Sequence, residues 1–357
     1  MIINKNDIFN ANLIVESDGK NLMSVDFFAS MMKNHPISAV SHAISIHDLG
    51  VVVNNDKSGV ALRTEENKFR IWLGGEFEPY IYRGQNKDYK FIPTIHRPAD
   101  QNKLLISLVQ REEFKNYFMA LPYYKRLSNI SIKGNTFDFD LEAVTQHYGF
   151  PTEYIDTTTN MNVALFFAYT YYDSGQYLPI TDFDAYKPML YIADYKTLLH
   201  ETEPIIVGFQ AVPRPLFQCA MAIKLPAKNN VKSLFRSIEL PKDKDLAIGV
   251  YNSFKKGFDL FPNDYMSEIA EKINRLKIIH SGTIDEFCTQ YNHSKNDILD
   301  LLRSKEFKLV DGNEYVFSDR ILHDIHSEIT NFILPWIQNN IGVRGTTPAI
   351  HEFMNKS

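Results

Sequence analysis

The sequence has few cysteines, no long apolar segment and no excess of positive charge. Its 357 residues include only Cys219 and Cys288, which lie far apart and form no Cys-x-x-Cys pattern. This spacing argues against a disulfide framework or a zinc knuckle, and it is typical of a reducing compartment. No apolar run approaches the length of a membrane span, and residues 1–12 lack the apolar core of a signal peptide. We therefore expect a soluble, cytoplasmic protein.

Several classes of site are also missing from the sequence. The formal net charge of −5 gives no electrostatic reason to expect nucleic acid or an anionic membrane as a general partner. There is no Gly-rich phosphate loop of the nucleotide-hydrolase kind and no Gly-x-Ser-x-Gly elbow. His323 and His326 are three residues apart, but no third ligand is evident, so we expect a surface helix there and no metal site.

The pattern of apolar and turn-forming residues divides the chain into three parts. Residues 1–75 indicate a small N-terminal α+β module, with a short helix at 26–32 and strands at 51–53 and 60–62. Residues 76–265 form the expected central domain, in which 99–124 are predicted to be one long helix. Residues 266–357 form the expected C-terminal module.

The C-terminal module has the pattern of a winged-helix-like unit. Helices are expected around 284–291 and 298–302, followed by a hairpin over 308–317 with Asp-Gly at its turn and a closing helix over 327–340. Between residues 285 and 320 there are eight acidic and five basic residues, a balance that disfavours duplex DNA. We expect a module for packing or for a protein partner.

The stretch from Gln146 to Asn160 is dense in polar residues and lies between two apolar segments. Gly149 and Pro151 break the chain between them, which is a common way to place functional groups on a rigid scaffold. An alternative is that residues 156–160 merely cap the following apolar helix, because their side-chain oxygens accept from the first N–H groups of a helix.

Four motifs together resemble the FRG family, which is named for its aromatic-Arg-Gly start. The resemblance covers residues 76–265. The motifs are Tyr82-Arg83-Gly84-Gln85 with Pro93 and Arg97 behind it, Gln146-His147-Tyr148-Gly149-x-Pro151-Thr152 with Asp156 and Thr158, Ala164-x-x-x-Ala168, and Arg214-x-x-x-Gln218.

The order of these motifs is similar to that of ADP-ribosyltransferases of the Arg-Ser-Glu type, an analogy at the level of the fold. The resemblance implies an α+β fold with a mixed, mostly antiparallel central sheet and flanking helices, and NAD as a substrate. Arg83 would hold its phosphates, Gln218 would orient the ribose, and His147 could be a general base or a core histidine. The other implied pocket residues are Tyr82, Gly84, Gln85, Tyr148, Thr152, Asp156 and Thr158.

The sequence departs from both patterns. Gln218 stands where the transferases carry a catalytic Glu, Glu153 replaces a usual arginine of the family, and Thr157 replaces a usual tryptophan. Two hypotheses therefore stay open. One is an ADP-ribosyltransferase or NAD glycohydrolase. The proteins with which the family is generally associated then suggest a bacterial toxin or phage-defence effector. The other is a module that binds a nucleotide or a protein without turnover.

Overall fold

The structure is a computed structural model of the whole chain. It describes residues 59–65, 68–73, 80–97, 100–128, 131–132, 135–207, 210, 212–225 and 231–328. The helix expected at 26–32, the strand expected at 51–53 and all but the start of the helix expected at 327–340 lie outside the described residues.

A six-stranded sheet forms the centre of the molecule, and each of its neighbouring strands pairs antiparallel. The expected α+β fold with a mostly antiparallel central sheet is thus confirmed. In spatial order the strands are β10 (Glu203–Ile206), β11 (Ala220–Lys224), β6 (Tyr154–Thr158), β3 (Tyr80–Gln85), β9 (Met189–Asp194) and β12 (Arg236–Glu239).

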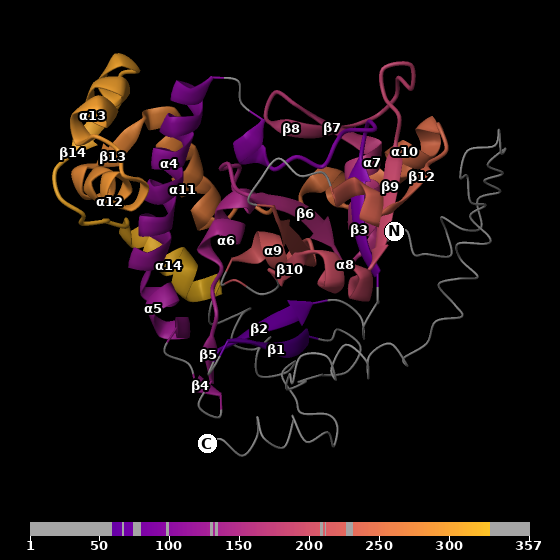
Figure 1. Cartoon of the computed structure of the whole chain (residues 1–357), viewed down its shortest axis with the longest axis horizontal. Helices are drawn as coiled ribbons and strands as arrows, with labels where there is room; N and C mark the ends of the chain where they lie inside the picture. The colour runs from indigo at the N-terminus through magenta and orange to yellow at the C-terminus, as the bar shows by residue number, and fades with distance from the viewer. Residues whose placement is uncertain are drawn as a thin grey trace.

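Alternating side chains of this sheet enter two separate cores, as the period of two along a strand requires. Ile81 packs on one face with Phe91 and Tyr191, near helix α8 (Tyr195–Glu201). Tyr82 packs on the other face, which the helices α7 (Met161–Tyr169) and α10 (Lys244–Ser253) cover. Figure 1 shows α7 and α10 beside β3 and β9. The apolar run after the polar stretch is therefore a helix buried against the sheet.

Two smaller sheets flank the central one. β7 (Thr170–Asp173) and β8 (Gln176–Pro179) form a hairpin whose turn residues Ser174 and Gly175 both have positive φ. A four-stranded sheet has the order β1 (Gly59–Glu65), β2 (Lys68–Leu73), β5 (Asn135–Phe137) and β4 (Ser131–Ile132). Since β2 pairs with β5, this sheet joins the expected N-terminal module to the central part of the chain.

The long helix expected over 99–124 is two helices. α4 (Gln101–Ala120) starts at Asp100, whose carboxylate accepts from the backbone N–H groups of Asn102 and Lys103. It ends at Leu121, and α5 (Pro122–Ser128) follows. A residue before proline is disfavoured in the helical conformation, and Leu121 is extended, so the chain turns there.

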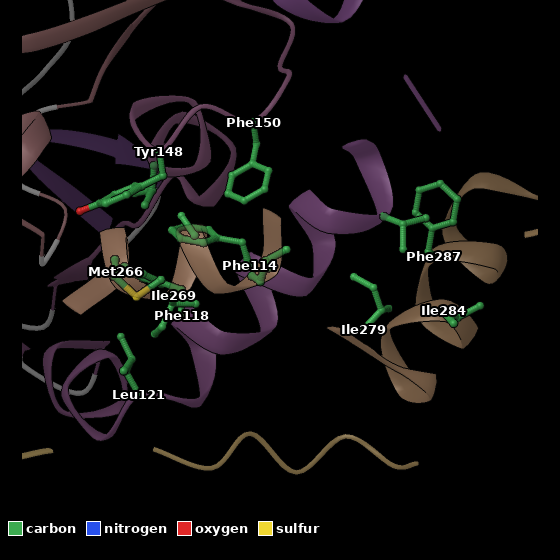
Figure 2. Packing of buried hydrophobic residues seen from close by; sticks show 14 of the residues in the cluster. Phe114, Phe118, Leu121, Tyr148, Phe150, Met266, Ile269, Ile279, Ile284 and Phe287 are labelled. Carbon is green, nitrogen blue, oxygen red and sulfur yellow. The ribbon is translucent and has the colours of Figure 1, made fainter. Parts of the chain in front are cut away.

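The helix α4 packs between the central domain and the C-terminal unit. On one side Phe114 contacts the rings of Tyr148 and Phe150. The same buried cluster includes side chains of α11 (Tyr265–Leu276), α12 (Ser281–Tyr291) and α13 (Lys295–Ser304). Figure 2 shows Met266 and Ile269 near Phe118, and Ile279, Ile284 and Phe287 on the far side of the helix. One continuous core therefore joins the two parts.

The C-terminal unit confirms the two expected helices, but the hairpin over 308–317 was wrong. Its first strand, β14 (Lys308–Val310), pairs parallel with β13 (Ile278–His280), and residues 311–318 are turn and irregular chain. Tyr315 packs against Tyr117 of α4 and against His280. Burial of this ring holds the segment on α4, so it does not return beside β14. A further helix, α14 (Asp319–Glu328), follows.

Candidate functional site

A cavity of about 220 Å³ opens at the ends of β3 and β6, beneath α7. It contains residues from all four sequence motifs, and His147 comes from α6 (Leu141–His147). Seven of the expected site residues thus come together here. The lining residues are Tyr82, Arg83, Gly84, His147, Asp156, Thr157, Thr158, Val163, Ala164, Phe167, Tyr177 and Gln218.

Gly84 determines how closely α7 approaches β3. A Cβ atom at this position would lie 1.7 Å from the carbonyl oxygen of Ala164 and 2.8 Å from the backbone nitrogen of Ala168. Glycine at the end of the strand and small residues on the helix are therefore parts of one contact. This contact holds α7 directly on β3 and places the adjacent Arg83 side chain at the cavity.

The protein compensates the positive charge of Arg83 only in part. Its Nη1 donates to the backbone carbonyl of Asp156, and its guanidinium lies 5.2 Å from the centre of the Phe91 ring. Its Nε is buried and has no hydrogen-bond partner among the described residues. Burial lowers the pKa of Arg83 to about 10, an effect that Asp156 opposes and Arg97 reinforces. The guanidinium stays charged at neutral pH, and no carboxylate of the described residues forms an ion pair with it.

Strand β6 presents Asp156 to the cavity. Its side chain is exposed whereas its neighbours along the strand are buried, and it is the one carboxylate among the lining residues. Thr158 is held by a hydrogen bond of 2.7 Å to the backbone carbonyl of Gln218. The buried hydroxyl of Thr157 has no partner among the described residues. The capping alternative holds for Asn160, which accepts from Asn162 at the start of α7, but not for Asp156.

His147 and Gln218 form a fixed pair in the cavity wall. Gln218 Nε2 donates to the carbonyl of Leu260 at 2.9 Å, so its Oε1 accepts from His147 Nδ1 at 3.0 Å. The proton of a neutral His147 is therefore on Nδ1, and Nε2 bonds to none of the described residues. Burial lowers the pKa of His147, opposed by Asp156 and by the Gln218 hydrogen bond. The imidazole is a neutral acceptor at pH 7.

Gln218 does not lie on a strand. It lies in the turn between α9 (Pro213–Phe217) and β11, and Cys219 after it has a positive φ of 45°. That left-handed residue turns the chain sharply. Consequently the amide reaches sideways to His147 and Leu260, and both of its polar atoms are already bonded.

Arg214, four residues before Gln218, supports the same wall from behind. Its guanidinium lies 4.6 Å from the centre of the Tyr148 ring, contacts Asp264 at 3.4 Å and donates to the carbonyl of His147 at 3.2 Å. Tyr148 in turn donates to Asp264. Burial raises the pKa of Asp264, and Arg214 opposes that rise. The second half of the Arg214-x-x-x-Gln218 motif thus fixes the His147 side chain, and the first half fixes its backbone.

Two expected pocket residues lie away from the cavity. Tyr148 is buried in the core beside Phe114, and its hydroxyl is bonded to Asp264. Thr152 is fully buried, and its hydroxyl donates to Gln146. Both residues shape the polar turn and do not line its opening.

A groove of about 610 Å³ adjoins the cavity and shares Arg83, Gly84, Phe167 and Tyr177 with it. The expected residue Gln85 lies here. Sequence reasoning missed the tyrosines of the β7–β8 hairpin, for which the Ser-Gly turn was the available signal. The remaining lining residues are Asn86, Tyr89, Lys90, Ile92, Arg97, Thr170, Tyr171 and Tyr172.

The described residues carry neither a cluster of metal-binding side chains nor a helix that could span a membrane. No cluster of three or more His, Cys, Asp or Glu side chains there could hold a metal ion. Within the same residues, no helix combines the length and the apolar character needed to cross a membrane.

Comparison with known proteins supports the family resemblance. Residues 78–176 match the FRG domain family, so the chain carries an FRG domain. The match includes β3, the polar turn, β6 and α7, and it ends before Gln218. Comparisons with curated proteins and with solved structures gave no match.

Proposed function

From an FRG domain whose motifs meet at one cavity, we propose that this site binds NAD and cleaves its nicotinamide–ribose bond. The protein is then an NAD glycohydrolase or an ADP-ribosyltransferase. The observation that carries this proposal is the convergence of Arg83, Asp156 and His147 on one cavity. Each supplies a different group that the reaction needs: a cation, a carboxylate and a neutral base.

Arg83 supports the binding of a phosphate. A partly buried guanidinium whose Nε has no partner among the described residues is costly, and a bidentate phosphate contact would compensate it. Arg97 lines the adjoining groove and interacts electrostatically with Arg83, so two cations face the same space. Repulsion between them falls when a dianionic pyrophosphate lies between them.

Asp156 and His147 support the chemistry. When the glycosidic bond breaks, its electron pair goes to the nicotinamide nitrogen and the sugar becomes cationic at C1′. The carboxylate of Asp156 would stabilise that charge. Water or an acceptor hydroxyl then attacks C1′ and passes its proton to Nε2 of His147. The products are nicotinamide, ADP-ribose or its adduct, and one proton.

Because position 218 carries no acid, we assign to Asp156 the role of stabilising the cationic sugar. A neutral amide cannot stabilise a cationic sugar, and both polar atoms of Gln218 already bond to protein groups. In our proposal Gln218 therefore positions His147, and Asp156 takes the electrostatic role. The unpartnered hydroxyl of Thr157 is available to a ribose hydroxyl or to the carboxamide.

The test is nicotinamide release by the purified protein and by Asp156→Asn, which keeps the shape and removes the charge. We expect release from NAD in the wild type and a loss of about 100-fold or more in the variant. Asp173→Asn is the matched control, because Asp173 is an exposed aspartate on the β7–β8 hairpin outside the lining. Equal rates in the two variants would remove Asp156 from the mechanism.

A second candidate is a module that binds a nucleotide without turnover. The observation that favours it is the neutral Gln218, engaged by the protein on both sides. In this case NAD or ADP-ribose binds through Arg83, and no nicotinamide appears even at high protein concentration. Calorimetry together with the release assay separates the two candidates.

The C-terminal unit carries a separate proposal. The C-terminal unit joins α4 through a buried core and offers few basic groups, so we propose a role in packing or in binding a protein partner, and no duplex DNA binding. A gel shift should show no tight, salt-sensitive complex.

Consumption of NAD would suit a toxin or defence effector, because it removes a metabolite that the cell needs. We propose cytoplasmic action for the same reason.

A further inference from the structure

The groove beside the cavity has two walls that the protein holds firmly. One wall is the segment 86–92 after β3, and the other is the β7–β8 hairpin, which lies above the central sheet in Figure 1. Asn86 ties them together by donating to the carbonyl of Thr170 at 3.0 Å. Asp88 accepts from Lys232 and from Tyr191, which anchors the first wall to the sheet. The groove is a built feature of the fold.

The lining of the groove combines cations with tyrosine rings. Arg83, Lys90 and Arg97 contribute positive charge, and no carboxylate is among the described lining residues. Tyr89 and Tyr172 are 50% and 64% exposed, so part of each ring is open to a ligand. Guanidinium groups beside exposed rings are the arrangement that binds a phosphate joined to a stacking base.

Gln85 adds a third feature to the groove. Its side chain lines the groove and is only 7% exposed, yet its amide oxygen has no hydrogen-bond partner among the described residues. A buried acceptor without a donor is unfavourable. A ligand that brings an N–H group to this point would correct the deficit, whereas a ligand with a carbonyl oxygen there would place two acceptors against each other.

We propose that the groove binds the adenylate half of the dinucleotide and that Gln85 selects the base by accepting from its exocyclic amino group. The base lies against Tyr89 and Tyr172, and the phosphates lie between Arg83 and Arg97. This inference rests on the proposed function, since it assigns the nicotinamide ribose to the cavity. It adds a specificity rule: a 6-amino purine binds, and a 6-oxo purine is rejected.

The experiment compares AMP with IMP by isothermal titration calorimetry on the full-length protein. These two ligands differ in the amino group and share the sugar and phosphate. We expect AMP to bind about tenfold or more tightly than IMP, and Gln85→Leu to remove that difference while the protein stays folded. Equal affinities in the wild type, or no binding of AMP, would overturn the inference.

Two further variants keep the inference testable if Gln85→Leu does not fold. Tyr89→Ala and Tyr172→Ala change exposed rings and should weaken both ligands without unfolding the protein. Phe258→Ala is the control, because Phe258 is 69% exposed and lies outside the groove lining. If Tyr89→Ala and Tyr172→Ala bind AMP like Phe258→Ala, the rings do not contact the base and the inference fails.

The outcomes separate this inference from the proposed function. Nicotinamide release together with equal binding of AMP and IMP would keep the enzyme and remove the base selection. Selective AMP binding without nicotinamide release would keep the groove and favour the binding module. A short single-stranded oligonucleotide that binds better than AMP would assign the groove to a polynucleotide and overturn the dinucleotide reading.

Discussion

Nδ1 of His147 lies 3.0 Å from Oε1 of Gln218, and the amide nitrogen of the same Gln218 bonds to the carbonyl of Leu260. This arrangement leaves one tautomer for a neutral imidazole. Nδ1 carries the proton, and Nε2 is free to accept a hydrogen bond. A glutamine at this position therefore determines the tautomer of the histidine that lines the cavity.

Gln218→Glu should raise the pKa of His147, because a carboxylate stabilises the imidazolium more than an amide does. The same change places a negative oxygen against the Leu260 carbonyl, and it should cost about 1–3 kcal/mol of unfolding free energy. Both effects are measurable by NMR titration of the histidine and by urea denaturation. An unchanged histidine titration would show that the pair does not form.

The pH dependence should reflect His147 directly. Its folded pKa is below its ordinary value of 6.5, so the unfolded chain binds the extra proton first as the pH falls. The contribution of His147 to the free energy of unfolding is therefore complete above pH 6.5 and declines as the pH falls below it. Turnover should also decline on the acid side, at a pH below 6.5. His147→Gln should remove this acid limb from the denaturation profile, whereas an exposed histidine variant, His293→Gln, should keep it.

Arg83→Met should weaken the binding of NAD without lowering the melting temperature of the protein. Removal of a buried charge that lacks a counter-ion is neutral or stabilising, so the melting temperature should stay or rise. Binding of NAD should fall by about 2–5 kcal/mol, the usual effect of losing one partner of a charged pair. Arg97→Met is the matched comparison, and because Arg97 is more exposed we expect a smaller loss. Tight binding by Arg83→Met would place the phosphate elsewhere.

Gly84→Ala should destabilise the protein strongly. The added methyl group would overlap the Ala164 carbonyl at 1.7 Å, and separating α7 from β3 should cost about 3 kcal/mol or more. Gly149→Ala is the control: it has a φ of +89° but no atom within 4 Å of the added Cβ, so only backbone strain of about 1 kcal/mol is expected. Similar losses of unfolding free energy in the two variants would contradict the close approach.

Glu113 should be essential to the junction between α4 and the C-terminal unit. It is fully buried, and its carboxylate bonds to Nδ1 of His280 at 2.6 Å and to the hydroxyl of Thr283. Glu113→Ala leaves the buried His280 ring without this partner, and it should cost about 3–5 kcal/mol. Asp259→Ala, which breaks the exposed pair with Lys255, should cost under about 0.5 kcal/mol. Chemical denaturation of both variants checks the difference.

The sequence by itself determined the class of the fold and the place of the candidate site. The apolar run predicted the buried segment that became α7, and the aromatic-Arg-Gly and polar-turn motifs predicted where functional groups would gather. These signals are local, because strand, helix and turn preferences depend mainly on neighbouring residues.

Only the tertiary structure decided which atoms those groups contact. Whether Gln218 faced a ligand or a histidine depended on Leu260, which is 42 residues away along the chain. Whether residues 311–318 returned beside β14 depended on the contact of Tyr315 with α4. The groove arose from the segment after β3 and a hairpin more than eighty residues later, joined by Asn86. Such contacts join distant segments, so no local pattern in the sequence records them.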